Sequence, residues 1–410
     1  MNDVINVIGA GLSGCEAALQ LSRRGKHVVL YDAKPTDLLP CYSLPSFAEL
    51  VCNNSLASRS SSSPLGLLVD ELRLLGSCLV RIADNCRVKD DEFLAVDKRA
   101  FSEAVTDELY KSGVCIKRKK VHELPKRGVN IIATGPLTDV EFADSISRSL
   151  GITKHHFADA SSIIIDISSL DLNNDQIEYI SDDLYLVHID NYNFHSFCEL
   201  LRSSAQANHI VDDSSIFKKC LSIEELAKKS DEELIDERFK YNNRNDICLV
   251  LRRETALKNG FIMVGCTTTL LHGDQLKAIS ILPGFSEVRI IKYGRMHRNT
   301  FFDSPGLLNS FYKVKNSDTY IIGQLSGIDG YAPAISSGLV SSLRIVFGET
   351  LPPFPTQTMI GALANYVSNQ KTVDFQPMCA SFSLIKPSGE ADYHTDSMRA
   401  LNNFIEHFQN

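Results

Sequence analysis

The sequence has no long apolar run and no recognisable export segment. No stretch approaches the roughly 18 consecutive apolar residues that a membrane-spanning helix needs, although 44% of the 410 residues are hydrophobic. Residues 1–4 contain no basic stretch followed by an apolar one, as a signal peptide would require. We therefore expect a cytoplasmic protein that does not contact a membrane.

Paired cysteines and metal-binding motifs are missing as well. The eleven cysteines are an odd number with irregular spacing, and nowhere are two of them separated by two residues. This pattern argues against a disulfide scaffold and against a zinc ribbon, and it fits a reducing compartment. The sequence thus predicts no metal site, and nothing in it indicates an oligomeric state.

A net positive charge is also missing, since 50 acidic residues outnumber 42 basic ones and the formal net charge is −8. This total disfavours a nucleic-acid partner, because phosphate contacts need local positive charge. A local basic face is still compatible with it. Residues 117–120 read Lys-Arg-Lys-Lys on an expected strand or edge. We interpret this run either as a solvated edge or as a contact for RNA.

A glycine-rich turn follows the first expected strand. Residues 4–8 are an apolar run, and residues 9–14 read Gly-Ala-Gly-Leu-Ser-Gly. A helix is expected over 16–24, and a second strand over 27–31 leads to Asp32. This order of strand, turn, helix and strand is typical of a dinucleotide-binding unit.

Each part of this unit has a physical reason. Gly9 permits the tight turn, Gly11 has no side chain to obstruct a pyrophosphate, and Gly14 lets the helix pack on the sheet. The free amides at the helix N-terminus face the phosphates, and Asp32 accepts hydrogen bonds from the ribose hydroxyls. The predicted contacts are Gly9, Ala10, Gly11, Leu12, Ser13, Gly14 and Asp32.

Two later segments favour FAD over NAD. Residues 129–136 form a buried strand that ends in Ala133-Thr134-Gly135, as in two-dinucleotide-fold flavoproteins. A further strand at 320–322 ends at Gly323 and leads through Gly330 into a helix, where such flavoproteins contact the flavin again. A protein that binds mainly NAD would have no reason to return to the site after residue 320.

We therefore predict an α/β fold, with a two-dinucleotide-fold, Rossmann-like FAD-binding domain and a mixed α/β inserted domain. The FAD-binding domain is expected over 1–150 and 286–380, and the inserted substrate domain over 151–285. Residues 381–410 form a C-terminal tail with little periodicity, which we expect to be poorly ordered.

Several segments together resemble one enzyme family. Residues 47–56 read Phe-Ala-Glu-Leu-Val-Cys-Asn-Asn-Ser-Leu, and residues 293–301 read Tyr-Gly-Arg-Met-His-Arg-Asn-Thr-Phe. Gly-Ala-Leu-Ala-Asn-Tyr at 361–366 and Phe-Gln-Pro-Met at 375–378 follow in the same order. The chain resembles the folate- and FAD-dependent tRNA (uracil-5-)-methyltransferases, the TrmFO family.

This resemblance implies a reaction and a set of catalytic residues. Methylenetetrahydrofolate would supply the carbon for C5 of a T-loop uridine in tRNA, with FAD reduced by NAD(P)H. Uracil C5 becomes nucleophilic once a thiolate adds to C6. Cys220 is the expected nucleophile and Cys52 its partner in proton removal or release, although the two roles could be exchanged. Tyr331, in a turn like one beside the family's flavin, either contacts the base or packs as a turn aromatic.

Departures from the family pattern keep other functions open. The family's Cys-Met-Pro-Ile-Glu is here Cys220 followed by Leu-Ser-Ile-Glu, and its Gly-Pro-Met-Lys stretch has no counterpart. The first alternative is the same chemistry on a ribosomal RNA uridine. The second is an inactive FAD-binding paralogue. The third is an FAD oxidoreductase of small molecules, which would need neither cysteine.

Overall fold

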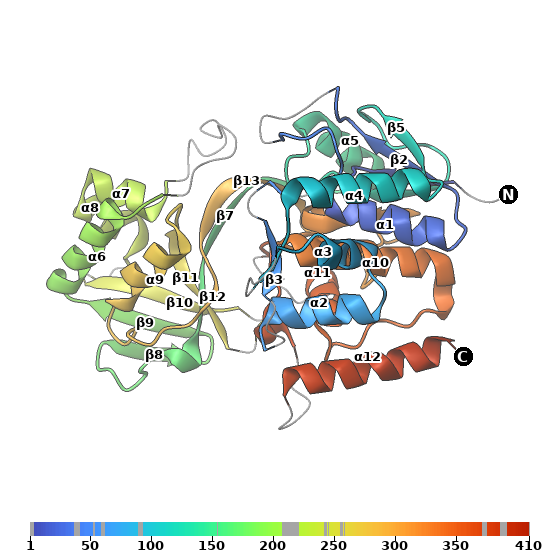
Figure 1. The fold of residues 1–410 in the computed structure, drawn as a ribbon. Coiled ribbons are helices and arrows are strands. Elements are labelled where there is room, and N and C mark those ends of the chain that lie inside the picture. Colours follow the sequence, from blue (N-terminus) through green and yellow to red (C-terminus); the bar gives the residue numbers. More distant parts are fainter. Residues whose placement is uncertain are drawn as a thin grey trace. The chain divides into compact units, whose positions relative to one another are not determined.

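The computed structural model divides the chain into two compact units, one made of Met1–Phe157 with Asn299–Asn410 and one made of Ala158–Arg298 (Figure 1). The inserted unit thus begins and ends later than the expected 151–285. The structure describes residues 4–36, 42–51, 54–58, 62–88, 93–153, 155–206, 221–241, 244, 246–254, 257, 259–370, 375–385 and 392–409. Within these residues, no helix has the length and apolar character to cross a bilayer.

The first unit is built on a five-stranded sheet in the order β14-β6-β1-β2-β5. Its strands are β1 (Ile5–Ile8), β2 (Val28–Asp32), β5 (Cys115–Arg118), β6 (Val129–Ile132) and β14 (Thr319–Ile321). All four pairings are parallel, with Val7 opposite Leu30 on one side and Ile131 on the other. This sheet confirms the predicted Rossmann-like fold class.

Helices cover this sheet. Helix α1 (Leu12–Arg23) packs beside α10 (Tyr331–Phe347), and a Cβ added to Gly338 of α10 would lie 2.3 Å from the Ser13 carbonyl oxygen (Figure 1). Helix α5 (Val140–Leu150) contributes Phe142 to a cluster with Ile8 of β1. This unit also contains β3 (Ser55–Ser58), α2 (Pro64–Leu74), α3 (Cys78–Asn85), β4 (Phe93–Ala95), α4 (Lys98–Lys111), α11 (Met359–Ser368) and α12 (Tyr393–Gln409).

The prediction of a poorly ordered tail is wrong, because α12 is a helix that packs beside α2 (Figure 1). Its inner face carries Ser397, Leu401 and Phe404, all buried. Phe404 stacks on Phe354 with ring centroids 4.5 Å apart. These three residues recur at intervals of four and three, so the sequence did carry a helical pattern that the prediction overlooked. The Ser397 hydroxyl donates to the buried Glu71 carboxylate of α2.

Glu71 links three helices of the first unit. Its carboxylate accepts from the backbone amides of Met359 and Ile360, at 2.7 and 2.8 Å, and from the Ser397 hydroxyl. The two amides open α11, so the carboxylate caps that helix. Burial nevertheless raises the pKa of Glu71 to about 7, since no cation lies among its hydrogen-bond partners.

We expect the stability of the protein to depend on pH through Glu71. The pKa of about 7 lies above the ordinary 4.5, so the folded state binds this proton more tightly than the unfolded chain does. The free energy of unfolding should therefore fall by roughly 3 kcal/mol as pH rises from about 4.5 to 7. Urea unfolding across this range should show the fall in the wild type and not in Glu71→Gln. The exposed Glu103→Gln serves as the control, and equal slopes in all three proteins would contradict the assignment.

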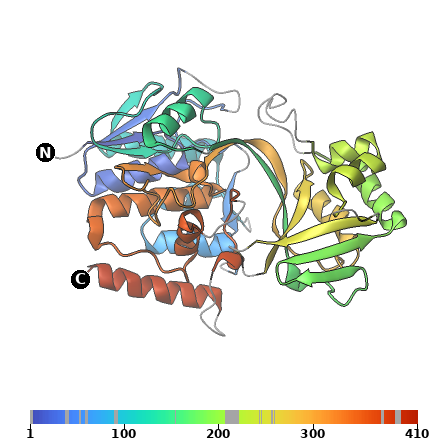
Figure 2. The ribbon, with the colours of Figure 1, turned by 180° about the vertical axis from the view of Figure 1, so that it is seen from behind.

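The second unit is a mixed α/β domain with an antiparallel sheet in the order β12-β7-β11-β10-β9-β8, to which β13 adds by pairing with β7. The strands are β7 (His155–Asp166), β8 (Ile177–Ser181), β9 (Leu184–Ile189), β10 (Ile247–Arg253), β11 (Gly260–Thr267), β12 (Ile290–Lys292) and β13 (Arg295–Phe302). Helices α6 (Asn191–Ser203), α7 (Ile223–Lys229), α8 (Asp231–Arg238) and α9 (His272–Ser280) lie on one face of this sheet (Figure 2).

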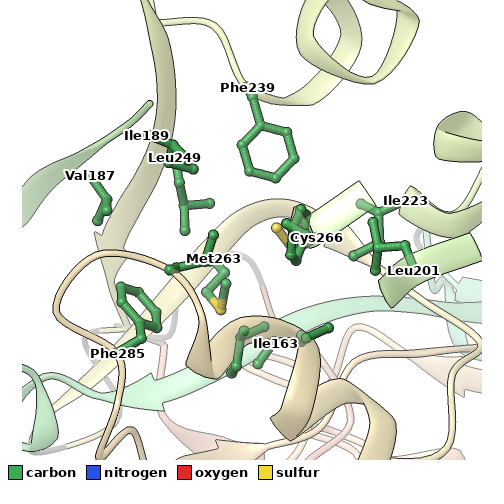
Figure 3. Close-up of a cluster of buried hydrophobic side chains, with 14 of the residues drawn as sticks. Ile163, Val187, Ile189, Leu201, Ile223, Phe239, Leu249, Met263, Cys266 and Phe285 are labelled. Atoms are coloured by element: carbon green, nitrogen blue, oxygen red, sulfur yellow. The ribbon is translucent and has the colours of Figure 1, made fainter. Parts of the chain in front are cut away.

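A single apolar core joins these helices to the sheet. Val187 of β9, Leu249 of β10 and Met263 of β11 point from the sheet toward Leu201 and Ile223 of the helices (Figure 3). Every second residue of the strands belongs to this core, such as Leu249 and Leu251 of β10, so one face of the sheet packs on it. The second unit therefore has a hydrophobic core of its own.

Candidate dinucleotide-binding site

The turn between β1 and α1 brings two chain segments into close contact. Gly9 has a φ of +102°, and a Cβ there would lie 2.4 Å from the Ala133 carbonyl oxygen at the end of β6. A Cβ on Gly14 would lie 1.9 Å from the Gly9 carbonyl oxygen. Both glycines are therefore required by the fold itself, because any side chain would collide with backbone.

Gly11 differs from these two glycines. Its φ is −75°, and a Cβ added there would meet no described protein atom within 4 Å. Gly11 is the N-cap of α1, and no described side chain caps the amides of the first turn. Open space in front of uncapped amides at a helix N-terminus is what a phosphate group requires.

The loop after β6 forms the next wall of the site. The hydroxyls of Thr134 and Thr138 lie 2.6 Å apart, and the Thr138 hydroxyl donates to the Gly135 carbonyl. Thr300 of β13 donates its amide to the Pro136 carbonyl at 2.8 Å. Beside Thr300, the Asn299 side chain is fully buried, and its amide has no hydrogen-bond partner in the described part of the chain. A buried amide of this kind costs free energy until a ligand satisfies it.

The chain returns to the first turn at Gly323, as the sequence predicts. Strand β14 pairs with β6, and a Cβ on Gly323 would lie 2.7 Å from the Ser13 hydroxyl oxygen of α1. The Gly323 amide donates to the Ser337 hydroxyl of α10 at 2.8 Å. Gly330, with a φ of +105°, is the N-cap of α10, and Tyr331 is the first residue of that helix. Thus the N-termini of both α1 and α10 belong to glycine turns at the ends of parallel strands.

A pocket at the end of β2 extends this site. Asp32 lines it, and its carboxylate accepts from the amides of Ala10 and Lys34, each at 2.8 Å. Each carboxylate oxygen has further lone pairs, so Asp32 can still accept from ribose hydroxyls. The pocket is lined by residues 8–11, 31–34 and 119–121, by Tyr42, Ala48, Glu49, Thr134, Leu137, Thr138, Asp139 and Phe142.

Sequence reasoning missed the ion pair in this pocket. Lys34 is buried, and its ammonium lies 2.7 Å from the Glu49 carboxylate and 3.9 Å from the centre of the Tyr42 ring. Burial acts to raise the pKa of Glu49, but the hydrogen bonds from Lys34 and Ser43 outweigh burial and leave that pKa below its ordinary value. The one feature of the sequence that could have pointed to Lys34 is its position two residues after Asp32, at the same end of β2.

The basic run at 117–120 lies at the edge strand β5 and beside this pocket. Arg118 is held locally, because its guanidinium stacks 4.0 Å from the centre of the Phe47 ring and donates to the Pro45 carbonyl. Lys119 and Lys120 line the pocket. Lys117, Lys119 and Lys120 are exposed, in agreement with the solvated-edge interpretation of the run, whereas Arg118 is held by local packing.

Of the three predicted catalytic residues, only Tyr331 lies in the part of the chain that the structure describes. Cys52 and Cys220 both lie outside the described residues, so their predicted roles stay predictions. Tyr331 is half-buried at the start of α10. Cys15 lies near the glycine turn but is buried, and burial raises the pKa of its thiol well above the ordinary value. Cys15 is therefore a structural thiol.

The segment just after Cys220 is firmly anchored. Ser222 caps α7 in a reciprocal pair with Glu225. Glu224 is fully buried, and its carboxylate accepts from the Thr268 hydroxyl at 2.8 Å and from the amide and hydroxyl of Thr269 at 2.7 and 2.6 Å. The Ile-Glu part of the motif that follows Cys220 thus has a defined structural role.

A dinucleotide fits the residues of the first unit. The open space at Gly11, the uncapped amides of α1 and the acceptor Asp32 match a pyrophosphate joined to an adenosine. The return of the chain at Gly323 places a second glycine turn beside Ser13 of α1. The fold and the site together define a dinucleotide-binding protein of the Rossmann-like class with a second, inserted unit.

Known proteins narrow this class to a family. The family model described as glucose inhibited division protein A matches residues 4–347. The chain is 35% identical over 432 residues to the methylenetetrahydrofolate–tRNA-(uracil-5-)-methyltransferase TrmFO of Acetivibrio thermocellus, with 98% of each chain covered. It is 36% identical over 400 residues to the TrmFO of Bacillus subtilis, with 93% of this chain and 92% of that protein covered. The chain therefore belongs to the glucose inhibited division protein A family, and within it to the TrmFO proteins.

A solved structure agrees at the level of the fold. The GidA protein of Aquifex aeolicus superposes with a TM-score of 0.53 at 15% identity, covering 99% of this chain and 73% of that one. At this identity the likeness concerns the fold alone. It supports the parallel-sheet unit with an insertion that the strand order shows.

Proposed function

We propose that this protein methylates C5 of a uridine in the T-loop of tRNA, with methylenetetrahydrofolate as carbon donor and FAD reduced by NAD(P)H. Similarity to TrmFO proteins over almost the whole chain supports this reaction. The single structural observation that carries it is the open space at Gly11, in front of the uncapped amides of α1. We place the enzyme in the cytoplasm, where free thiols persist.

The residues of the first unit would hold FAD. The amides that open α1 would bind the pyrophosphate, Asp32 would bind the adenosine ribose, and the turns at Gly135, Gly323 and Gly330 would receive the rest of the cofactor. When bound, FAD would supply the electrons that reduce the one-carbon unit of the folate to a methyl group. Asn299 offers a buried amide to a ligand from β13.

The protein's own groups would activate the uracil. The thiolate of Cys220 adds to C6, which places negative charge on C5 and makes it nucleophilic. C5 then forms its bond to the one-carbon unit of the folate, and Cys52 takes part in removing the C5 proton. Once that carbon has been reduced to a methyl group, the thiolate leaves C6 as the C5–C6 double bond re-forms. Tyr331, at the opening of α10, is the proposed contact to the base.

The assay that tests this function uses the purified FAD-loaded protein, a tRNA T-loop substrate, methylenetetrahydrofolate and NAD(P)H. We expect 5-methyluridine in the tRNA, detected by mass analysis of nucleosides. Product on ribosomal RNA alone would indicate the other RNA target. FAD binding without product on either RNA would indicate an inactive paralogue. Oxidation of NAD(P)H coupled to the reduction of a small molecule, without RNA product, would indicate an oxidoreductase.

A further expectation concerns Glu224, which we propose as a positioning residue for Cys220. Glu224→Ala removes an acceptor of three hydrogen bonds in the interior and should lower the free energy of unfolding by about 3 kcal/mol. Methyl transfer should fall roughly tenfold, because the nucleophile's segment loses its anchor. Flavin absorbance should be unchanged, since Glu224 belongs to the inserted unit.

Glu224→Gln should recover much of this loss, because its amide oxygen can still accept from the Thr269 amide. The exposed Glu232→Ala is the matched control within the same unit. Full transfer activity in Glu224→Ala, measured at saturating RNA, would rule out the positioning role.

A further inference from the structure

We propose that His188, Asp246 and Cys248 of the inserted unit form a binding site for Zn²⁺. The imidazole Nδ1, the carboxylate Oδ2 and the thiol Sγ of these residues all lie within 4.8 Å of one another. Nitrogen, sulfur and carboxylate oxygen are the donor atoms that zinc takes in proteins. We call these three residues the β9–β10 cluster.

Strand pairing brings the cluster together. His188 of β9 and Cys248 of β10 are direct partners in the antiparallel register. The His188 amide donates to Gln176 and the Cys248 amide donates to Phe239, so both amides point away from the shared strand pair. In such a non-hydrogen-bonded pair the two side chains approach closely. Asp246 lies just before β10 and adds its carboxylate from the same strand end.

The spacing of the donor atoms is close to that of a zinc site. Bond lengths of about 2.0–2.3 Å at tetrahedral angles place donor atoms roughly 3.3–3.6 Å apart. Sγ of Cys248 lies 3.4 Å from Nδ1 of His188 and 3.2 Å from Oδ2 of Asp246. The carboxylate is 2.6 Å from Nδ1, and a small rotation of the exposed Asp246 side chain opens this distance. Three protein ligands leave one position of the ion for water.

An outer carboxylate orients the histidine. Nε2 of His188 lies 2.9 Å from the Glu178 carboxylate, which is held in turn by both terminal nitrogens of Arg244, at 2.6 and 3.2 Å. A histidine that binds a metal through one nitrogen commonly donates its other N–H to a carboxylate, which fixes the ring.

The thiol must lose its proton to bind the ion. Binding of Zn²⁺ forms the sulfur–zinc bond and releases the thiol proton to solvent. The ion also neutralises the local negative charge of Asp246 and of the new thiolate.

The test titrates the FAD-loaded protein, stripped of metal with a chelator, with Zn²⁺ against a competing dye, and with Co²⁺ for a thiolate-to-metal absorption band. We expect one Zn²⁺ per chain and a Co²⁺ band that Cys248→Ser abolishes. Asp246→Ala, at an exposed position, should weaken binding at least tenfold without unfolding the protein. Glu178→Gln should weaken it about 10–100-fold, as loss of an outer-shell partner does.

The matched control is the exposed Cys115→Ser, which lies in the other unit and should leave zinc affinity and the Co²⁺ band unchanged. Equal affinity in wild type, Cys248→Ser and Asp246→Ala would overturn the proposal. So would a Co²⁺ band that disappears in Cys52→Ala or Cys220→Ala and persists in Cys248→Ser. Methyl transfer is measured separately, because the zinc site does not depend on the proposed reaction.

Discussion

The Gly11→Asp variant is expected to stay folded and to lose FAD. The new side chain points into open space, because no described protein atom lies within 4 Å of a Cβ at this position. Asp is a favourable N-cap, and its negative charge suits the positive end of the α1 dipole. The same carboxylate occupies the position of the pyrophosphate and repels it, which costs several kcal/mol. We therefore expect FAD affinity to fall at least about 100-fold, which is roughly 2.7 kcal/mol.

Two measurements separate binding from folding in this variant. Flavin fluorescence quenching gives the affinity, and thermal unfolding of the FAD-free proteins gives the stability, which should equal or exceed that of the wild type. Gly14→Ala should instead lose both FAD and stability, since its Cβ would lie 1.9 Å from the Gly9 carbonyl oxygen. Gly273→Asp, near the start of α9, is the matched control with free space around its Cβ. If Gly11→Asp binds FAD normally, the pyrophosphate does not lie at α1.

The largest expected effect is the loss of methyl transfer in Cys220→Ala and Cys52→Ala. Without Cys220 the uracil C5 is not activated, and without Cys52 the C5 proton is not removed. Losses of about 10³-fold or more are usual for groups that take part directly in the chemistry. FAD binding should persist in both variants, because the glycine turns and Asp32 that hold the cofactor are unchanged. The assay follows 5-methyluridine in single turnover, together with flavin absorbance.

The two cysteines can be told apart by the RNA adduct. If Cys220 adds to C6, a 5-fluorouridine T-loop substrate should form a covalent complex with wild type and Cys52→Ala, and not with Cys220→Ala. The reverse pattern would exchange the two roles. Cys115→Ser, at an exposed position on β5, should retain full activity. Full NAD(P)H turnover on a small molecule in Cys52→Ala would favour the oxidoreductase instead.

Much of the nucleotide-binding half could be predicted from sequence because its signals are local. The apolar run of β1, the glycines of the turn and Asp32 at the end of β2 are consecutive features of one strand–helix–strand unit. The return at Gly323 was predictable for the same reason, as β14 and α10 repeat the pattern. Local patterns of this kind need no knowledge of distant partners.

The residues that sequence reasoning missed depend on contacts between distant segments. Helix α12 has a polar residue on its inner face, and only the buried Glu71 of α2 explains why Ser397 belongs there. Lys34 acquires its role through Glu49 and Tyr42, which follow it in a loop. Neither pairing produces a periodic signal in the sequence.

The sequence by itself determined the parallel sheet and the glycine turns, because chain order, hydrophobic periodicity and the need for a missing side chain are properties of short segments. The tertiary structure alone decided which polar groups meet. Helix packing brings Ser397 within hydrogen-bond distance of Glu71, and the register of β9 and β10 places His188 opposite Cys248. The physical reason is that antiparallel register and helix docking are set by the burial of apolar faces over the whole unit, and polar side chains become neighbours as a consequence.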